Sequence, residues 1–278
     1  MMKRKAFCAL LAVMMLLSAC SPSAEQSPTP GTTDKPSQES TSEPSSKPTD
    51  QPTDEPTGEP ASAEDFTIID GKLTEYKGSG GAVTIPDGVT EIEEYAFANC
   101  MGLTSVTIPD SVTGIGDGAF YNCGNLTGVV IPNSVTSIGA DSFSGCGSLI
   151  SIAIPDSVTF IGNGAFSVCV SLTGVTIPGS ITCISEKLFV NCISLTGVTI
   201  LDGVTSIGSD VFRDCISLTS VTIPASVTSI ENGAFYGCTG LTDVYYGGGR
   251  EQWNQISVDN TNLGNYLLLN AATIHYNS

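Results

Sequence analysis

Basic side chains are scarce in this sequence of 278 residues. Ten Lys and Arg stand against 28 Asp and Glu, which gives a formal net charge of −18 at neutral pH. A nucleic-acid partner would require clustered Lys and Arg to neutralise its phosphates, so this charge balance excludes one. Residues 65–278 contain too few bases to form a polybasic patch against an anionic membrane surface.

Histidine is also nearly absent, with one copy in the whole chain. A Ser-His-Asp or Cys-His catalytic site would have to be built around His275, close to the C-terminus. Ten cysteines are present, but no two follow the Cys-x-x-Cys spacing of a structural zinc site. We therefore predict that the protein is not an enzyme and that it holds no cofactor and no metal ion.

Long apolar runs are missing except at the start, where the basic residues 3–5 precede the apolar residues 6–17. This run is too short to span a bilayer and is typical of a secretion signal. It leads into Leu-Ser-Ala-Cys, which resembles the lipobox of bacterial lipoproteins. We predict a signal peptide at residues 1–20 and lipid attachment at Cys20, with the protein exported and anchored to the outer face of the bacterial cell membrane through this lipid only. An ordinary signal peptide with an incidental cysteine is the alternative.

Residues 21–64 contain no aromatic side chain and are rich in Pro, Ser, Thr and Glu. Such a segment cannot bury a core, and its prolines and like charges favour extended conformations. We predict a disordered linker that holds the following domain away from the membrane.

The remaining chain carries a repeat of 23 residues. Cysteines keep this step from Cys100 to Cys238, and leucines from Leu103 to Leu241. A fixed period of this length is typical of a solenoid, in which each coil covers the apolar side chains of the next at the strand spacing of about 4.8 Å. The phenylalanines that mark the period are Phe97, Phe120, Phe143, Phe166, Phe189, Phe212 and Phe235.

The first half of each unit resembles a leucine-rich repeat and reads Leu103-x-x-Val106-x-Ile108-x-x-Ser111-Val112. The second half narrows the resemblance and reads Ala119-Phe120-x-x-Cys123. Together with the 23-residue step, it is similar to the BspA-type (Treponema-type) leucine-rich repeat family of microbial surface proteins. The resemblance implies a repeat solenoid outside the cell, with short parallel strands and short helical turns. It also implies protein binding or adhesion, but it does not fix the ligand.

Both ends of the domain at residues 65–278 should be capped, because a solenoid coil cannot leave its core open. Asp70-Gly71 suits the tight turn of a hairpin. At the other end, we expect Tyr246 to continue the column of Ile223 and Trp253 to continue the column of Ile230. The predicted parts are an N-terminal cap at 65–79, repeats at 80–245 and a C-terminal cap at 246–278.

The cysteines of the repeat should be buried free thiols, because equivalent side chains in stacked coils project in parallel and are poorly placed for disulfides. Cys183 lies outside this column and is expected to be exposed and reactive. A column of acids after the strands, including Asp87, Asp110 and Asp156, leaves calcium binding open as a weaker alternative to turn formation. An unbroken threonine column from Thr90 to Thr228 is explained by strand propensity rather than by an ice-binding face.

The position after each repeat phenylalanine carries anchor-type side chains in three coils: Tyr121, Arg213 and Tyr236. Tyr and Arg are enriched among residues that dominate binding energy, so we predict a protein-binding site at these residues. The alternative is that they only cover the edge of the core. We expect a monomer that binds an extracellular or host protein. A structural spacer of the cell envelope and a carbohydrate-capturing lipoprotein are the rival functions.

Overall fold

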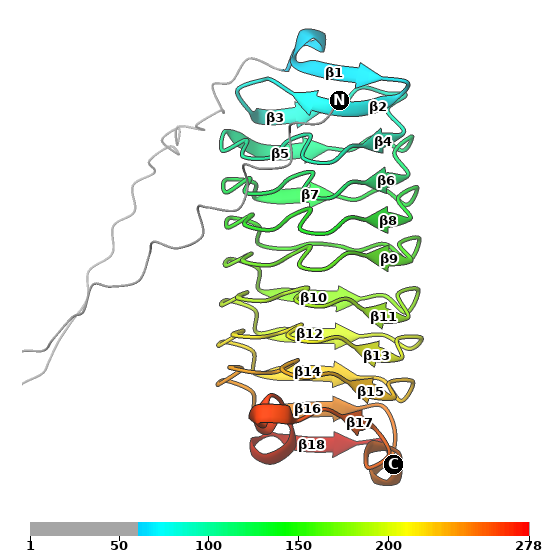
Figure 1. Ribbon diagram of the computed structural model, residues 1–278, viewed down its shortest axis with the longest axis vertical. Coiled ribbons are helices and arrows are strands. Elements are labelled where there is room, and N and C mark those ends of the chain that lie inside the picture. Colours follow the sequence, from blue (N-terminus) through cyan, green and yellow to red (C-terminus); the bar gives the residue numbers. More distant parts are fainter. Residues whose placement is uncertain (1–60, 278) are drawn as a thin grey trace, which may run out of the picture. The chain divides into compact units, whose positions relative to one another are not determined.

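The computed structural model describes residues 61–277, which belong to one compact unit. In this unit, short strands and turns form coils that stack along one axis (Figure 1). The predictions for residues 1–60, including the signal peptide, the linker and Cys20, lie outside the described residues.

The N-terminal cap is the predicted hairpin. After a single helical turn, η1 (Ala63–Asp65), strands β1 (Phe66–Ile69) and β2 (Lys72–Tyr76) pair antiparallel. Asp70 and Gly71 both have positive φ angles, of 52° and 77°, as a two-residue hairpin turn requires.

The repeats build two rows of parallel strands, one from each half of the 23-residue unit. Residues 23 apart lie opposite one another in both rows, for example Val175 and Val198. In the first row, isolated bridges at Ala153 and Ser151 connect a three-stranded and a five-stranded sheet. Its strands are β3 (Gly81–Thr84), β5 (Leu103–Thr107), β7 (Gly128–Val130), β10 (Gly174–Ile177), β12 (Gly197–Ile200), β14 (Ser220–Ile223), β16 (Asp243–Tyr246) and β18 (Thr273–Tyr276).

The second row consists of two-residue strands. The strands are β4 (Glu91–Ile92), β6 (Gly114–Ile115), β8 (Ser137–Ile138), β9 (Phe160–Ile161), β11 (Cys183–Ile184), β13 (Ser206–Ile207), β15 (Ser229–Ile230) and β17 (Ser257–Val258). The first of them, β4, pairs with strand β2 of the hairpin. From β4 to β15, each short strand places one isoleucine in the core and leaves the preceding residue at least partly exposed, whereas β17 carries the half-buried Val258.

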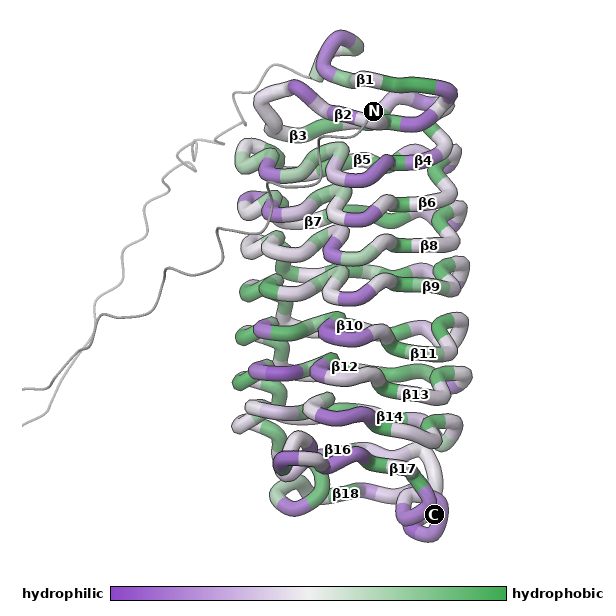
Figure 2. The backbone as a smooth tube through the Cα atoms, in the orientation of Figure 1, coloured by the Kyte–Doolittle hydropathy of each residue, from purple (hydrophilic) through white to green (hydrophobic). Residues whose placement is uncertain are grey.

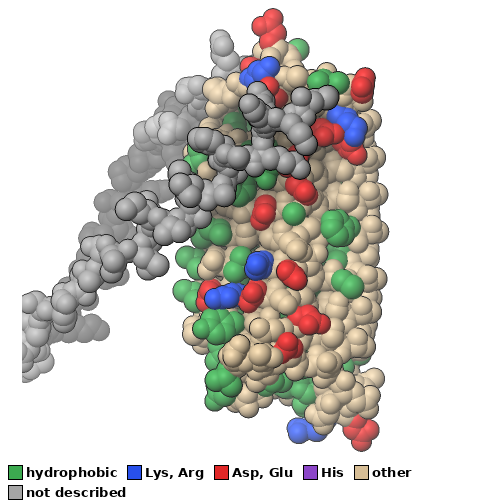
Figure 3. Space-filling view, viewed as in Figure 1, with side chains coloured by type: hydrophobic (Ala, Val, Ile, Leu, Met, Phe, Trp, Pro, Cys, Tyr) green, Lys and Arg blue, Asp and Glu red, His purple; other side chains and the backbone are tan. Residues whose placement is uncertain are grey.

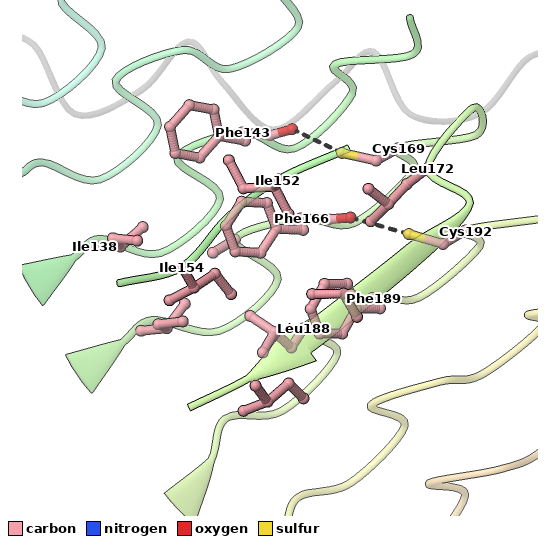
Figure 4. Close-up of a cluster of buried hydrophobic side chains, with 14 of the residues drawn as sticks. Ile138, Phe143, Ile152, Ile154, Phe166, Cys169, Leu172, Leu188, Phe189 and Cys192 are labelled. Atoms are coloured by element: carbon pink, nitrogen blue, oxygen red, sulfur yellow. Dashed lines mark hydrogen bonds between the residues drawn. The ribbon is translucent and has the colours of Figure 1, made fainter. Parts of the chain in front are cut away.

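The seven repeat phenylalanines form the predicted column at the centre of the core, and all are fully buried. Neighbouring rings are stacked from Phe97 to Phe212, with centroids 5.4 Å apart for Phe143 and Phe166 and 5.6 Å apart for Phe166 and Phe189 (Figure 4). The last pair, Phe212 and Phe235, is tilted by 31°. Hydrophobic segments recur at the same places in successive coils (Figure 2). Tyr76 of the hairpin stacks on Phe97 at 4.8 Å and so extends the column into the N-terminal cap.

Each phenylalanine lies in a compact turn. The short helical turns expected here are single hydrogen-bonded turns, such as the bond from the Cys146 N–H to the Phe143 carbonyl. The residue two places after the phenylalanine has a positive φ angle in every coil, which explains the frequent Asn, Gly and Asp at that position. These residues are Asn99, Asn122, Gly145, Val168, Asn191, Asp214 and Gly237.

The cysteine column behaves as predicted. All described cysteines are free, and six members of the column are buried while Cys100, next to the N-terminal cap, is partly exposed. Each buried thiol donates a hydrogen bond to a phenylalanine carbonyl of the preceding coil, as from Cys169 to Phe143 and from Cys192 to Phe166 (Figure 4). Cys183 is exposed, as expected, and its reactivity remains a prediction.

The C-terminal cap confirms one expected register and corrects the other. Tyr246 lies opposite Ile223, as predicted. The residue opposite Ile230 is Val258, so the placement of Trp253 in that column is wrong. A short helix, α1 (Arg250–Trp253), and the turn after it interrupt the 23-residue period, and Trp253 instead packs edge-on against Tyr246 at 5.2 Å. The cap ends with η2 (Thr261–Leu263), η3 (Leu267–Ala271) and β18.

Candidate binding edge

The turns that follow the buried phenylalanines bring the three predicted binding residues to the surface. Tyr121 and Tyr236 are 41% and 47% exposed, and the Arg213 side chain is 46% exposed. Because each follows a fully buried ring in an equivalent turn, the three occupy one column along the solenoid. We call this surface, together with the neighbouring turn residues, the binding edge.

Arg213 and Tyr236 form a pair. The guanidinium carbon lies 5.0 Å from the centroid of the tyrosine ring, which is a cation–π geometry. Asp210 and Asp214 contact the same guanidinium at 3.6 and 3.4 Å and so hold it over the ring. The pair is therefore positioned before any partner arrives.

Tyr121 belongs to a second group, four coils away from Arg213. Its ring meets Tyr95 edge-on, with centroids 6.5 Å apart and planes at 88°. The three predicted residues thus share a column but form two separate aromatic clusters, one at each end of the binding edge.

Exposed aliphatic side chains lie between these clusters, and the sequence reasoning missed them. Val168, Ile193 and Ile216 are 42%, 42% and 50% exposed, and Val170 is half-buried. We call these four residues the apolar edge. The signal available in the sequence was a departure from the repeat, because the positions equivalent to Val170 in the two preceding coils are Gly124 and Gly147. In Figure 3, hydrophobic side chains gather along one border of the solenoid, beside a few basic and acidic side chains.

A hollow of about 260 Å³ lies along the second strand row, over β4 and β6, and another of about 240 Å³ opens among the turns. The second lies in the middle of the binding edge and is lined by Asp141, Asn163, Gly164, Ser167, Glu186, Lys187 and Val190. Burial and the negative charge of Asp117 raise the pKa of Asp141, whereas the nearby Lys187 lowers it. The hollow is thus unfavourable for additional negative charge.

His275, the candidate imidazole, lies on the outward face of the first strand row. Its Nε2 is 2.7 Å from Asp243 Oδ1, and its ring stacks on Tyr245 with centroids 4.7 Å apart. Hydrogen bonds with His275 and from Thr242 lower the pKa of Asp243. Both side chains are partly exposed, so the contact is a surface hydrogen bond between an imidazole and a carboxylate.

Residues 61–277 contain neither a cluster of metal ligands nor a membrane-spanning helix. No three His, Cys, Asp or Glu side chains in this range come close enough to hold a metal ion. No helix in the same range has the length and apolar character needed to cross a membrane.

Comparisons with known proteins identify the repeat. The family model described as BspA type leucine rich repeat region matches residues 68–196 and 159–277, with six copies. A search of curated proteins found no match. Among solved structures, a leucine-rich repeat protein of T. pallidum is 29% identical, with a TM-score of 0.51, and the match covers 79% of this chain and all of that one. A leucine-rich repeat protein of Eubacterium ventriosum is 25% identical with a TM-score of 0.51, covering 60% of this chain and 55% of that one. The chain belongs to the BspA-type leucine-rich repeat family of bacterial surface proteins.

Proposed function

We propose that this protein is a surface-displayed binding module that captures another protein through the binding edge. The observation that carries the proposal is the exposed Arg213–Tyr236 pair, fixed in place by Asp210 and Asp214. Arg and Tyr are the residue types in which binding energy concentrates. A side chain held in its bound position loses less entropy on association, so the pair is suited to act as an anchor.

The same proposal assigns the display of this module to the N-terminal sequence. Basic residues, a short apolar run and Leu-Ser-Ala-Cys20 support export, lipid attachment at Cys20 and retention at the outer face of the membrane. Replacing Cys20 with alanine tests the anchor. The variant is expected to leave the membrane fraction, and its retention there at the native level would contradict the assignment.

Capture by residues 21–278, a soluble chain without the signal peptide and the lipid-bearing cysteine, tests protein binding. For a captured extracellular protein, Arg213→Ala and Tyr236→Ala should each weaken affinity by about 1 kcal/mol or more, the usual mark of an anchor residue. Tyr121→Ala tests whether the second cluster takes part. Tyr266→Ala is the matched control, because this tyrosine is equally exposed but lies in the C-terminal cap.

A structural spacer is the alternative that a negative result would favour. It needs no anchor residues, so all four variants would leave envelope properties and melting temperatures unchanged. Affinity that is unaffected in Arg213→Ala, Tyr236→Ala and Tyr121→Ala alike would remove the binding edge as the site.

A further inference from the structure

Val168 occupies a conformation that suits it poorly. Its φ angle is 57°, in the left-handed region, where the Cβ of an L-residue is crowded and a β-branched side chain is an outlier. The equivalent residue in the other six coils is Asn, Gly or Asp. Valine also gains little burial here, because 42% of its surface remains exposed. Backbone strain that is not offset by burial of the side chain often marks a functional site, so we look for a role of Val168 in binding.

The apolar edge continues from Val168 into the following coils. Val170, Ile193 and Ile216 occupy one repeat position in three successive coils, so their side chains stack at the coil spacing of about 4.8 Å. The same position carries Gly147 before them and Thr239 after them, which limits the apolar edge to this part of the solenoid. A contiguous group of branched aliphatic side chains in water marks a surface where another molecule packs.

Charge limits what that molecule can be. Four acids lie on the binding edge: Asp141 and Glu186 line the hollow, and Asp210 and Asp214 contact Arg213. The two bases there are Lys187, in the same hollow, and Arg213, which these two aspartates already hold. An anionic lipid surface or a second copy of this acidic chain would therefore be repelled. A carbohydrate would find aliphatic side chains where it needs aromatic faces and hydrogen-bonding groups.

We propose that the apolar edge docks a segment of a partner protein that carries both aliphatic and basic side chains. The aliphatic side chains of the partner pack on Val168, Ile193 and Ile216. Its Lys or Arg side chains lie in the hollow beside Asp141 and Glu186, where these two exposed carboxylates outnumber the one base, Lys187. This inference rests on the proposed protein-binding function and adds the chemistry of the partner.

The test uses residues 21–278 and a short fluorescent peptide of Lys and Leu as the probe. Two companion peptides carry Ser in place of Leu, with the same charge, or Glu in place of Lys. The Lys–Leu peptide should bind about tenfold more tightly than either companion in fluorescence anisotropy. Equal binding of the Lys–Ser peptide would reduce the effect to attraction by net charge and overturn the proposal.

Val168→Asn locates the site without endangering the fold, because Asn is the residue of three equivalent turns. It should weaken the Lys–Leu peptide about fivefold, and Ile193→Thr and Ile216→Thr should act in the same direction. Phe160→Thr is the control, since this exposed aromatic lies in the second strand row. Native affinity in Val168→Asn, or an equal loss in Phe160→Thr, would overturn the proposal.

The peptide experiment and the capture experiment can fail independently of each other. If the peptide fails to discriminate while capture of a natural protein still depends on Arg213 and Tyr236, the partner chemistry is wrong and the binding function stands. If capture is independent of Arg213, Tyr236 and Tyr121 alike, the binding edge is not the site, and the proposed partner chemistry is wrong as well.

Discussion

The middle coils and the C-terminal cap satisfy the same backbone groups by different means. In the middle, a peptide carbonyl of the next coil accepts each phenylalanine N–H, as from Phe143 to Ala165 at 2.8 Å. In the last coil, the side-chain oxygen of Asn265 accepts the Phe235 N–H at 3.1 Å. The amide nitrogen of the same fully buried side chain donates to the carbonyls of Glu231 and Asp259. One asparagine thus replaces the peptide groups of a missing coil.

The middle coils therefore have distributed stability, and the caps have concentrated stability. The middle coils share their stabilisation among many equivalent contacts, each repeated at 23-residue intervals. The caps depend on a few side chains that occur once, such as Tyr76 over Phe97 and Trp253 against Tyr246. Conditions that affect every coil should therefore damage the middle most, and single substitutions should be felt most specifically in the caps.

Alkaline pH should have the largest effect, because it acts on the whole thiol column at once. Burial raises the pKa of Cys146 and Cys215 to about 12 and raises the pKa of the other buried thiols as well. Their stabilising contribution is complete below the unfolded pKa of roughly 8.5 and falls as the pH rises above it, since only the unfolded chain ionises. At about pH 9.5, each buried thiol lowers the free energy of unfolding by about 1.4 kcal/mol relative to neutral pH, and the six together lower it by roughly 8 kcal/mol.

Denaturant midpoints measured at neutral pH and at about pH 9.5, under reducing conditions, give this loss of stability. Replacing Cys146 and Cys215 with alanine should lower stability at neutral pH but recover about a third of the alkaline loss. The same stability at both pH values would show that the thiols ionise within the fold and that the column is not sealed from water.

Phe166→Ala should have the next largest effect, because the ring is fully buried between Phe143 and Phe189. Deleting a buried phenylalanine costs about 3 to 5 kcal/mol. Ser167→Ala is the neighbouring control and should cost about 1 kcal/mol, since it loses one hydrogen bond to Ser144. Equal shifts of the two denaturant midpoints would contradict the inward orientation of the phenylalanine column.

The contrast between middle and cap also explains what the sequence could predict. Because the same residue type recurs at one position in seven coils, the sequence predicts the buried Phe and Cys columns. Cys183 could be predicted as exposed because its position varies between coils. Trp253 was placed by extending the same period into a region where α1 interrupts it. The role of Asn265 could not be predicted from the sequence, because a side chain that replaces the hydrogen-bonding groups of a further coil occurs only once and follows no repeat. The three anchor residues were predicted as exposed types, but their separation into two clusters depends on side-chain contacts that no spacing encodes.

Asn265→Leu tests the concentrated stability of the C-terminal cap. The substitution leaves one buried N–H and two carbonyls without their partner and should cost about 2 to 4 kcal/mol, less than Phe166→Ala in most of its range. Hydrogen exchange should show the loss first in the last coil. Asn270→Ala, at an exposed site in the same cap, should be close to neutral. A loss of protection spread evenly over all coils would argue that the cap and the middle coils unfold as one unit.

The smallest predicted effect lies within the middle coils, at the turn where the repeat departs from its own rule. Val168→Asn should raise stability by about 1 kcal/mol, because Asn tolerates the left-handed region better than a β-branched side chain. Asn191→Val makes the reverse change at the equivalent residue of the next coil and should lose a similar amount. Thermal melting of the two single variants and of the double variant Val168→Asn/Asn191→Val measures these effects. If each turn responds only to its own backbone, the double variant should melt at nearly the native temperature. A stability loss in Val168→Asn would mean that the valine packs favourably enough to outweigh its strain, and Val168 would then belong to the fold rather than to a surface kept for a partner.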